Sequence, residues 1–142
     1  MTSSIHFFYE DVDFHFANIR KTKAWLKDVF KTENKRLREL NYIFCSDGFL
    51  AGVNLQYLHH NTLTDIITFD TSEDVRFIAG EIFISLDRVK ENALKFRASF
   101  EEELHRVMVH GVLHLVGYSD KTSQQKKIMR KKEDAYLSLR PI

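Results

Sequence analysis

The 142-residue sequence contains one cysteine, one proline and five glycines. A single cysteine, Cys45, excludes an internal disulfide and fits a reducing compartment. With the one proline at position 141 and few glycines, no stretch resembles a linker between domains. No signal-peptide pattern and no apolar run of the ~20 residues that span a bilayer are present. These absences predict one globular domain over residues 1–142, located in the cytoplasm and without a membrane partner.

A strong charge of one sign is also missing. The sequence has 21 lysines and arginines against 20 aspartates and glutamates, which gives a formal net charge of +1. The net charge therefore does not indicate nucleic-acid binding. Basic residues do gather in two segments, 20–27 and 126–132. Such patches attract phosphates, although a solvated helix face is the simpler interpretation of each.

Apolar residues make up 44% of the chain and include twelve phenylalanines, enough for a folded core. Their spacing predicts four strands, at about 4–9, 40–45, 66–69 and 80–86. It predicts five helices, at about 18–32, 47–57, 87–97, 99–116 and 123–139. The expected helix caps are Asp47, Asp87, Ser99 and Ser123. The fold class predicted from this order is α+β.

The segment 110–120 has the strongest chemical signal. His110 and His114 stand four residues apart in an apolar, predicted helix, so both imidazoles can reach one metal ion from the same face. Gly117 can adopt the left-handed conformation that ends a helix, and the reversed chain can bring Asp120 back toward the pair. Two histidines and one carboxylate leave zinc an open fourth position, as in catalytic sites. These residues predict a metal-dependent hydrolase.

The histidine spacing by itself is a weak signal, because seven histidines in a chain of this length produce such pairs by chance. Either ring alone would fit core packing, with a backbone carbonyl as its partner. The glycine turn and Asp120 make metal binding the better interpretation.

Three segments also carry a family resemblance. HGVLHLVGYSD at 110–120 resembles the HGxLHLxGYDH signature of the YbeY family, bacterial metal-dependent endoribonucleases associated with ribosomal RNA maturation. Residues 54–69, which end in TDIITF, resemble that family's LNxxYR…TDVLSF segment, and AGEIFI at 79–84 is similar to its GDIxI strand. The order and spacing match from about residue 5 to residue 139.

The resemblance implies a mixed sheet with the metal site on a central helix. It implies one Zn²⁺ per chain, or another divalent metal, held by His110, His114 and Asp120. It also implies cleavage of single-stranded RNA in ribosome quality control and in maturation of the 3′ end of small-subunit (16S) ribosomal RNA. Ribosomal RNA and the small ribosomal subunit would then be the partners, and the oligomeric state stays open.

The chain departs from the family pattern at two positions. Asp120 stands where the family has its third ligand histidine, and aspartate remains a competent zinc ligand. Leu58 stands where the family has an arginine thought to act on RNA.

Zinc peptidases share the HxxxH spacing but place a glutamate general base after the first histidine. Gly111 occupies that position here and has no side chain to accept a proton. A peptidase is therefore disfavoured, because its catalytic base is absent. Asp65, in the second family segment, is the candidate for orienting water or substrate, with capping of the local loop as an equal alternative. Tyr118 could donate a hydrogen bond to a phosphate or simply pack. Glu81 could orient a metal-bound histidine.

The neighbouring His59 and His60 are expected in a polar loop, with surface rather than metal-binding roles. Three functions remain open: the endoribonuclease, a non-enzymatic ribosome assembly factor with a structural metal, and another zinc hydrolase such as a peptidase or phosphoesterase. The absence of the arginine at Leu58 favours the second function, and Gly111 counts against peptides.

Overall fold

In a computed structural model of the chain, residues 3–58 and 64–141 are described, and His59 and His60 lie outside them. In this described part of the chain, four strands form one sheet in the order β1-β2-β4-β3. They are β1 (Ser4–Tyr9), β2 (Leu37–Cys45), β3 (Ile66–Asp70) and β4 (Ile78–Ser85). β1, β2 and β4 run parallel, whereas β3 pairs antiparallel with β4 and forms an edge of the sheet.

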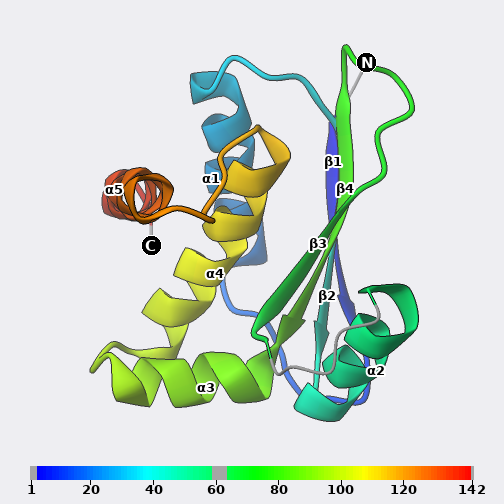
Figure 1. Cartoon of the computed structure of the whole chain (residues 1–142), viewed down its shortest axis with the longest axis vertical. Helices are drawn as coiled ribbons and strands as arrows, with labels where there is room; N and C mark the ends of the chain where they lie inside the picture. Colours follow the sequence, from blue (N-terminus) through cyan, green and yellow to red (C-terminus); the bar gives the residue numbers. More distant parts are fainter. Residues whose placement is uncertain (1–2, 59–63, 142) are drawn as a thin grey trace.

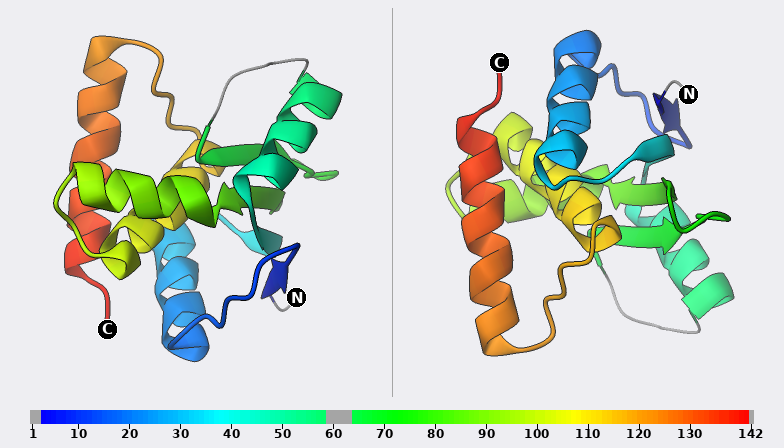
Figure 2. Two further views of the ribbon diagram at one scale, coloured as in Figure 1. Left: turned by 90° about the horizontal axis from the view of Figure 1, so that it is seen from below. Right: turned by 90° about the horizontal axis from the view of Figure 1, so that it is seen from above.

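Within the described ranges, five helices accompany the sheet. They are α1 (Ile19–Thr32), α2 (Asp47–Leu58), α3 (Leu86–Lys95), α4 (Phe100–Leu115) and α5 (Ser123–Ser138). α1 and α4 cover one face of the sheet, α2 lies against the other, and α5 packs on the outer side of α4 (Figure 1). The views along the vertical axis show α4 between the sheet and α5 (Figure 2). This arrangement is the predicted α+β fold with a mixed sheet.

Helix α4 is the centre of the core because it is apolar on most of its circumference. Its buried residues include Met108, Val112 and Leu113, each with no exposed area. Met108 also accepts a hydrogen bond at its carbonyl oxygen from the buried Tyr42 hydroxyl of β2, at 2.9 Å. Helix α4 is therefore fixed against the sheet, and the groups on its remaining face are held rigidly.

The strands and helices agree with the sequence prediction, whereas three of the four predicted helix caps are wrong. Ser99 caps α4 as predicted, and its hydroxyl accepts from Glu102 N–H. Ser85 rather than Asp87 caps α3, and Thr122 rather than Ser123 caps α5 with a complete capping box. At the start of α2, the Ser46 hydroxyl accepts from Phe49 N–H. In each case the cap is a hydroxyl one or two residues earlier in the chain, and Ser85 and Thr122 have the extended backbone that a cap requires.

Asp47 has a different role from the predicted cap. Its carboxylate accepts hydrogen bonds from the Ser85 hydroxyl at 2.7 Å and from Arg88 Nε at 2.9 Å. It therefore ties α2 to the start of α3. No helix within the described residues combines the length and apolar character that crossing a bilayer requires.

Candidate metal centre

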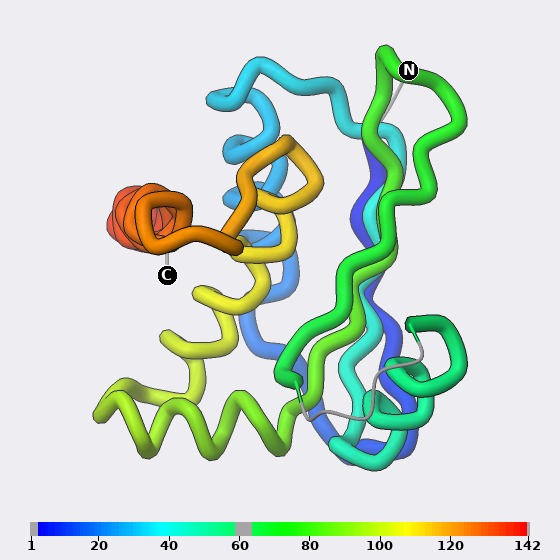
Figure 3. The backbone as a smooth tube through the Cα atoms, viewed as in Figure 1, coloured from blue at the N-terminus to red at the C-terminus, as the bar shows by residue number. Residues whose placement is uncertain are grey.

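His110 and His114 lie on the last two turns of α4, and Asp120 lies in the loop that follows. Gly117 has φ of +116°, which reverses the chain, and Tyr118 N–H then donates to the Leu113 carbonyl at 2.9 Å. The tube in Figure 3 shows this loop turning back from the end of α4 toward α5. The glycine turn thus brings the carboxylate to the histidine pair, as the sequence predicted.

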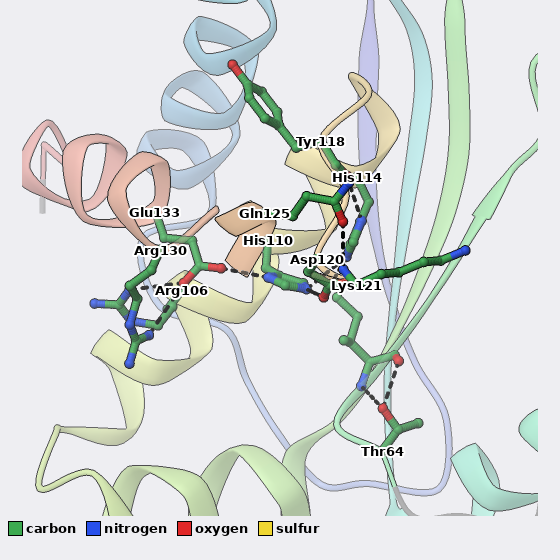
Figure 4. Close-up of polar contacts among 11 residues, drawn as sticks. Thr64, Arg106, His110, His114, Tyr118, Asp120, Lys121, Gln125, Arg130 and Glu133 are labelled. Atoms are coloured by element: carbon green, nitrogen blue, oxygen red, sulfur yellow. Dashed lines mark hydrogen bonds and ion pairs between the residues drawn. The ribbon is translucent and has the colours of Figure 1, made fainter. Parts of the chain in front are cut away.

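The three side chains converge on one point (Figure 4). The two Nε2 atoms are 3.0 Å apart, and Asp120 Oδ2 lies 3.3 Å from each of them. A tetrahedral zinc ion with bonds of ~2.0–2.1 Å holds its ligand atoms about 3.3 Å apart. The triangle therefore has the dimensions of one face of a zinc coordination tetrahedron. The imidazoles keep 22% and 29% of their area exposed and the carboxylate 40%, so a fourth position is open to solvent.

The hydrogen bonds of the two rings direct electron pairs toward that point. His114 Nδ1 lies 2.9 Å from the Tyr118 carbonyl oxygen, which can only accept, so this nitrogen carries the proton. His110 Nδ1 lies 2.6 Å from Glu133 Oε2. In the neutral rings, each Nε2 then presents a lone pair. In that protonation state two lone pairs and a carboxylate oxygen converge on one point, and a cation there satisfies all three.

Glu133 of α5 is the group that orients His110. It is 5% exposed, and its second oxygen accepts from Arg106 at 3.0 Å. Burial opposes ionisation, but the hydrogen bond from His110 and the Arg106 charge together lower the pKa of Glu133. Burial likewise opposes a charge on His110, yet Glu133 and Asp120 raise the pKa of His110 on balance. Glu133 is therefore an ionised carboxylate behind the candidate ligand His110 (Figure 4).

The prediction for Glu81 is wrong. Gly80 and Ile82 face α4, since a Cβ on Gly80 would meet Leu115 and one on Gly111 would meet Ile82. Side chains alternate along a strand, so the intervening Glu81 points to the opposite face of the sheet. No local sequence pattern indicates a role for Glu133, which is 23 residues from His110. It directly follows the basic segment 126–132, for which an ordinary charged helix face is the simpler interpretation.

A cleft of about 580 Å³ opens beside the ligand triangle. It follows β3 between α4 and the end of α2, and its lining includes Asn54, Leu58, Thr64, Asp65, Thr68, Asp70 and the three candidate ligands. Leu58 therefore faces the cleft, at the position where the resemblance expects an arginine. The lining contains the carboxylates of Asp65, Asp70 and Asp120 and, among the described residues, no lysine or arginine.

Asp65 lies in this cleft close to the candidate ligands. It also lines a smaller cavity of about 310 Å³ on the other side of His110, together with Asp120 and Glu133. Burial raises the pKa of Asp65, and the nearby His110 lowers it only in part. Its carboxylate accepts a hydrogen bond from Asn92 at 3.4 Å, and its backbone carbonyl accepts from Ser85 N–H at 2.9 Å. Asp65 is thus a partly desolvated carboxyl with proton affinity above the usual range, as a general base requires.

Tyr118 contributes its main chain to the centre. Its carbonyl fixes His114, whereas its hydroxyl donates to Glu33 at 2.8 Å, at the end of α1. Glu33 also accepts from Tyr136 and Lys132, which join α1, the metal-site loop and α5. The ring points away from the histidine pair in Figure 4. A hydrogen bond from the Tyr118 hydroxyl to a phosphate stays a prediction. In this rotamer the hydroxyl points away from the histidine pair and could not make that bond.

Close packing explains Gly111, which occupies the position of the peptidase base. A Cβ built on Gly111 would lie 2.7 Å from Ile82 Cδ1 and 3.1 Å from Ile66 Cδ1. Ile82 is fully buried, so the neighbouring chains have little room to move. A glutamate at this position would have to displace the Ile82 and Ile66 side chains beneath α4. The helix therefore contacts β3 and β4 too closely to carry the peptidase residue.

We expect Gly111→Ala to lower the free energy of unfolding by about 1 kcal/mol. Overpacking costs about 1–3 kcal/mol, and the better helix propensity of alanine returns about 1 kcal/mol. Gly52→Ala in α2 is the matched control, because its Cβ would meet nothing within 4 Å. It should raise stability by up to about 1 kcal/mol. Urea unfolding of both variants measures the difference, and equal stabilisation of the two would contradict the close contact at Gly111.

Comparisons with known proteins cover nearly the whole chain. The family model described as Endoribonuclease YbeY matches residues 6–139. A Cytophaga hutchinsonii protein named Endoribonuclease YbeY is 50% identical over 137 residues, which cover 96% of each chain. A protein of the same name from Amoebophilus asiaticus is 48% identical over 135 residues, 95% of this chain and 92% of its own. A solution structure of a Thermotoga maritima protein has a TM-score of 0.66 at 30% identity and covers 95% of this chain and 87% of that one.

Proposed function

This chain belongs to the YbeY family, and we propose that it is a metal-dependent endoribonuclease. The observation that carries the proposal is the ligand triangle of His110, His114 and Asp120, with edges of 3.0, 3.3 and 3.3 Å, at the side of an open cleft. The proposed substrate is single-stranded RNA, and by its family the enzyme would act on the 3′ end of small-subunit ribosomal RNA during ribosome maturation and quality control. Ribosomal RNA and the small ribosomal subunit are the proposed partners.

The residues of the triangle would hold one divalent ion, which we propose to be Zn²⁺. When bound, such an ion lowers the pKa of a coordinated water and withdraws charge from a phosphoryl oxygen. The protein keeps His110 in its Nε2-ligating tautomer through Glu133 and His114 through the Tyr118 carbonyl. The cleft along β3 would orient the RNA strand next to these ligands.

Asp65 is the proposed proton acceptor. It lines both cavities that adjoin the ligand triangle, and Gly111 leaves the peptidase position without a proton-accepting side chain. A base with a raised pKa accepts a proton from the attacking hydroxyl or water and can pass it to the leaving oxygen. Asn92 donates to one carboxylate oxygen and restricts its rotation.

Asp65→Asn should lower the single-turnover rate of RNA cleavage by about 10²–10⁴-fold, the usual contribution of a general base. Only the ionised carboxylate accepts a proton, so the wild-type rate should fall as the pH drops through the raised pKa of Asp65. In Asp65→Asn this acidic limb of the pH profile should disappear. Asp70→Asn removes a carboxylate from the far end of the same cleft and should have a small effect. Cleavage by Asp65→Asn at the wild-type rate would remove Asp65 from the chemistry.

A non-enzymatic ribosome assembly factor is the second candidate function. One observation favours it: Leu58 lines the cleft where a guanidinium could otherwise contact the scissile phosphate. Binding of the small ribosomal subunit by rigorously repurified protein, without cleavage of RNA at any zinc concentration, would establish this alternative. Metal-dependent cleavage that disappears in His114→Ala would exclude it.

A further inference from the structure

A second groove lies away from the metal centre and is strongly basic. It has a volume of about 530 Å³ and is lined by Ser3, Lys27, Phe30, Lys31, Lys35, Arg36, Leu37 and Phe77. Four of these residues are cations, and none is acidic. We call this feature the basic groove. The net charge of the chain is only +1, so the groove concentrates positive charge that the rest of the molecule offsets.

The cations of the basic groove are available for a ligand. None of the side chains of Lys27, Lys31, Lys35 and Arg36 forms an ion pair with a carboxylate in the described ranges 3–58 and 64–141. Lys31, Lys35 and Arg36 are exposed, and Phe30 and Leu37 beneath them are buried. Lysines near the end of a helix also complement its dipole, but that effect accounts only for Lys31, in the last turn of α1.

Helical spacing extends the basic groove along α1. Arg20, Lys23, Lys27 and Lys31 follow one another at intervals of three, four and four residues, which places them on one side of the helix. The sequence suggested a solvated helix face for this segment. The structure places Lys27 and Lys31 of this row in one groove with Lys35 and Arg36, which precede β2, and these cations form a basic track.

Phe77, which lines the basic groove, belongs to a stack of side chains. The guanidinium of Arg38 lies 5.1 Å and that of Arg76 5.6 Å from the centre of the Phe77 ring. Aromatic rings and guanidinium planes are the surfaces on which unpaired bases stack. A basic track beside such a stack fits a single-stranded nucleic acid better than a duplex or an acidic protein.

The metal-site cleft itself offers no permanently cationic side chain to RNA, because its described lining holds three carboxylates and no lysine or arginine. Binding of an RNA strand therefore requires a positive surface elsewhere. A polyanionic strand gains no attraction from these side chains. The hairpin of β3 and β4 joins the two places: Asp70 lines the cleft, and Phe77 lines the basic groove. The end of α1, the start of β2 and the turn of this hairpin lie at the same end of the molecule (Figure 1).

We propose that the basic groove binds the phosphate backbone of single-stranded RNA and holds the strand while a neighbouring segment enters the metal-site cleft. This proposal rests on the proposed function for its substrate class. In this arrangement the basic groove provides the affinity for the phosphate backbone. The family's arginine could contribute to this affinity, but the chain has Leu58 at that position. The Arg38–Phe77–Arg76 stack would hold one base of the bound strand.

The test compares two triple variants of the full-length, metal-loaded protein. Lys27→Gln, Lys31→Gln and Lys35→Gln remove three charges from the basic groove. Lys126→Gln, Lys127→Gln and Lys131→Gln remove three charges from α5 and serve as the matched control. Fluorescence anisotropy with a labelled 2′-O-methyl oligouridylate, which lacks the 2′-hydroxyl, measures affinity over a range of salt concentrations. Cleavage of a long unstructured RNA and of a trinucleotide is measured in parallel.

The groove variant should bind the oligouridylate at least about tenfold more weakly, and the slope of log affinity against log salt should become shallower by about 2. Its KM for long RNA should rise, and its cleavage of the trinucleotide should stay unchanged. The α5 variant should bind like the wild type. Wild-type affinity of the groove variant, or equal losses in both variants, would overturn the proposal. If the wild type cleaves neither RNA but the groove variant still loses affinity, the proposed function fails and the basic groove stands.

Discussion

Replacing His114 with alanine should leave the protein without its metal and lower the rate of RNA cleavage by about a thousandfold. The remaining pair, His110 and Asp120, offers two ligand atoms, too few to hold a zinc ion against water. The bound ion contributes several kcal/mol of charge stabilisation in the transition state, which corresponds to this loss of rate. Elemental analysis of protein purified without chelator measures the metal, and single-turnover cleavage measures the rate.

Variants of Asp120 supply the control for this result. Asp120→Ala removes the third ligand and should behave like His114→Ala. Asp120→His restores an imidazole at the position where the family signature has one, and should keep one ion per chain. Retention of metal in Asp120→Ala would mean that the third ligand is another group, despite the 3.3 Å distances to both imidazoles.

Glu133→Ala should weaken metal binding about 10–100-fold, the usual cost of losing a carboxylate behind a ligating histidine. His110 would lose the 2.6 Å contact that holds its ring and its tautomer. Glu133→Gln keeps an oxygen that can accept from Nδ1 but removes the charge, so its loss should be smaller. Competition with a chromogenic chelator measures the zinc affinity directly and does not depend on RNA cleavage.

Asp134→Asn is the matched control for the Glu133 variants. Asp134 neighbours Glu133 on α5 and accepts from the same Arg106, at 2.8 Å, but its side chain is 60% exposed and has no recorded contact with His110. Its substitution should leave zinc affinity unchanged. Equal losses of zinc affinity in Asp134→Asn and in the Glu133 variants would show that the effect comes from Arg106 and the packing of α5. The orientation of His110 would then not be its cause.

The ligand triangle could be predicted from the sequence because it is local. His110 and His114 are one helical turn apart, and Gly117 reverses the chain within three residues of the second ligand. Helix geometry and a single glycine conformation therefore determine how Asp120 approaches the pair. The same locality explains why the strands and helices were predicted to within a few residues.

The parts of the site that depend on packing could not be predicted. Glu133 reaches His110 only because α5 packs against α4. The local sequence pattern of neither helix indicates this contact. The prediction that Glu81 orients a metal-bound histidine is wrong because the direction of its side chain depends on which strand residues meet α4. The presence of glycine at position 111 is also explained by a contact between distant segments, because Ile66 and Ile82 lie against it. The basic groove likewise joins α1 to β2 and to the β3–β4 hairpin.

The most direct test of the account is the dependence of RNA cleavage on stoichiometric metal. Wild-type protein is stripped with chelator, repurified, and titrated with zinc while cleavage of a single-stranded RNA and bound metal are measured on the same samples. The stripped protein should show no cleavage, and the rate should rise linearly to a plateau at one ion per chain. Cleavage by the stripped protein at the wild-type rate would contradict a metal-dependent endoribonuclease, as would full occupancy of the site without cleavage.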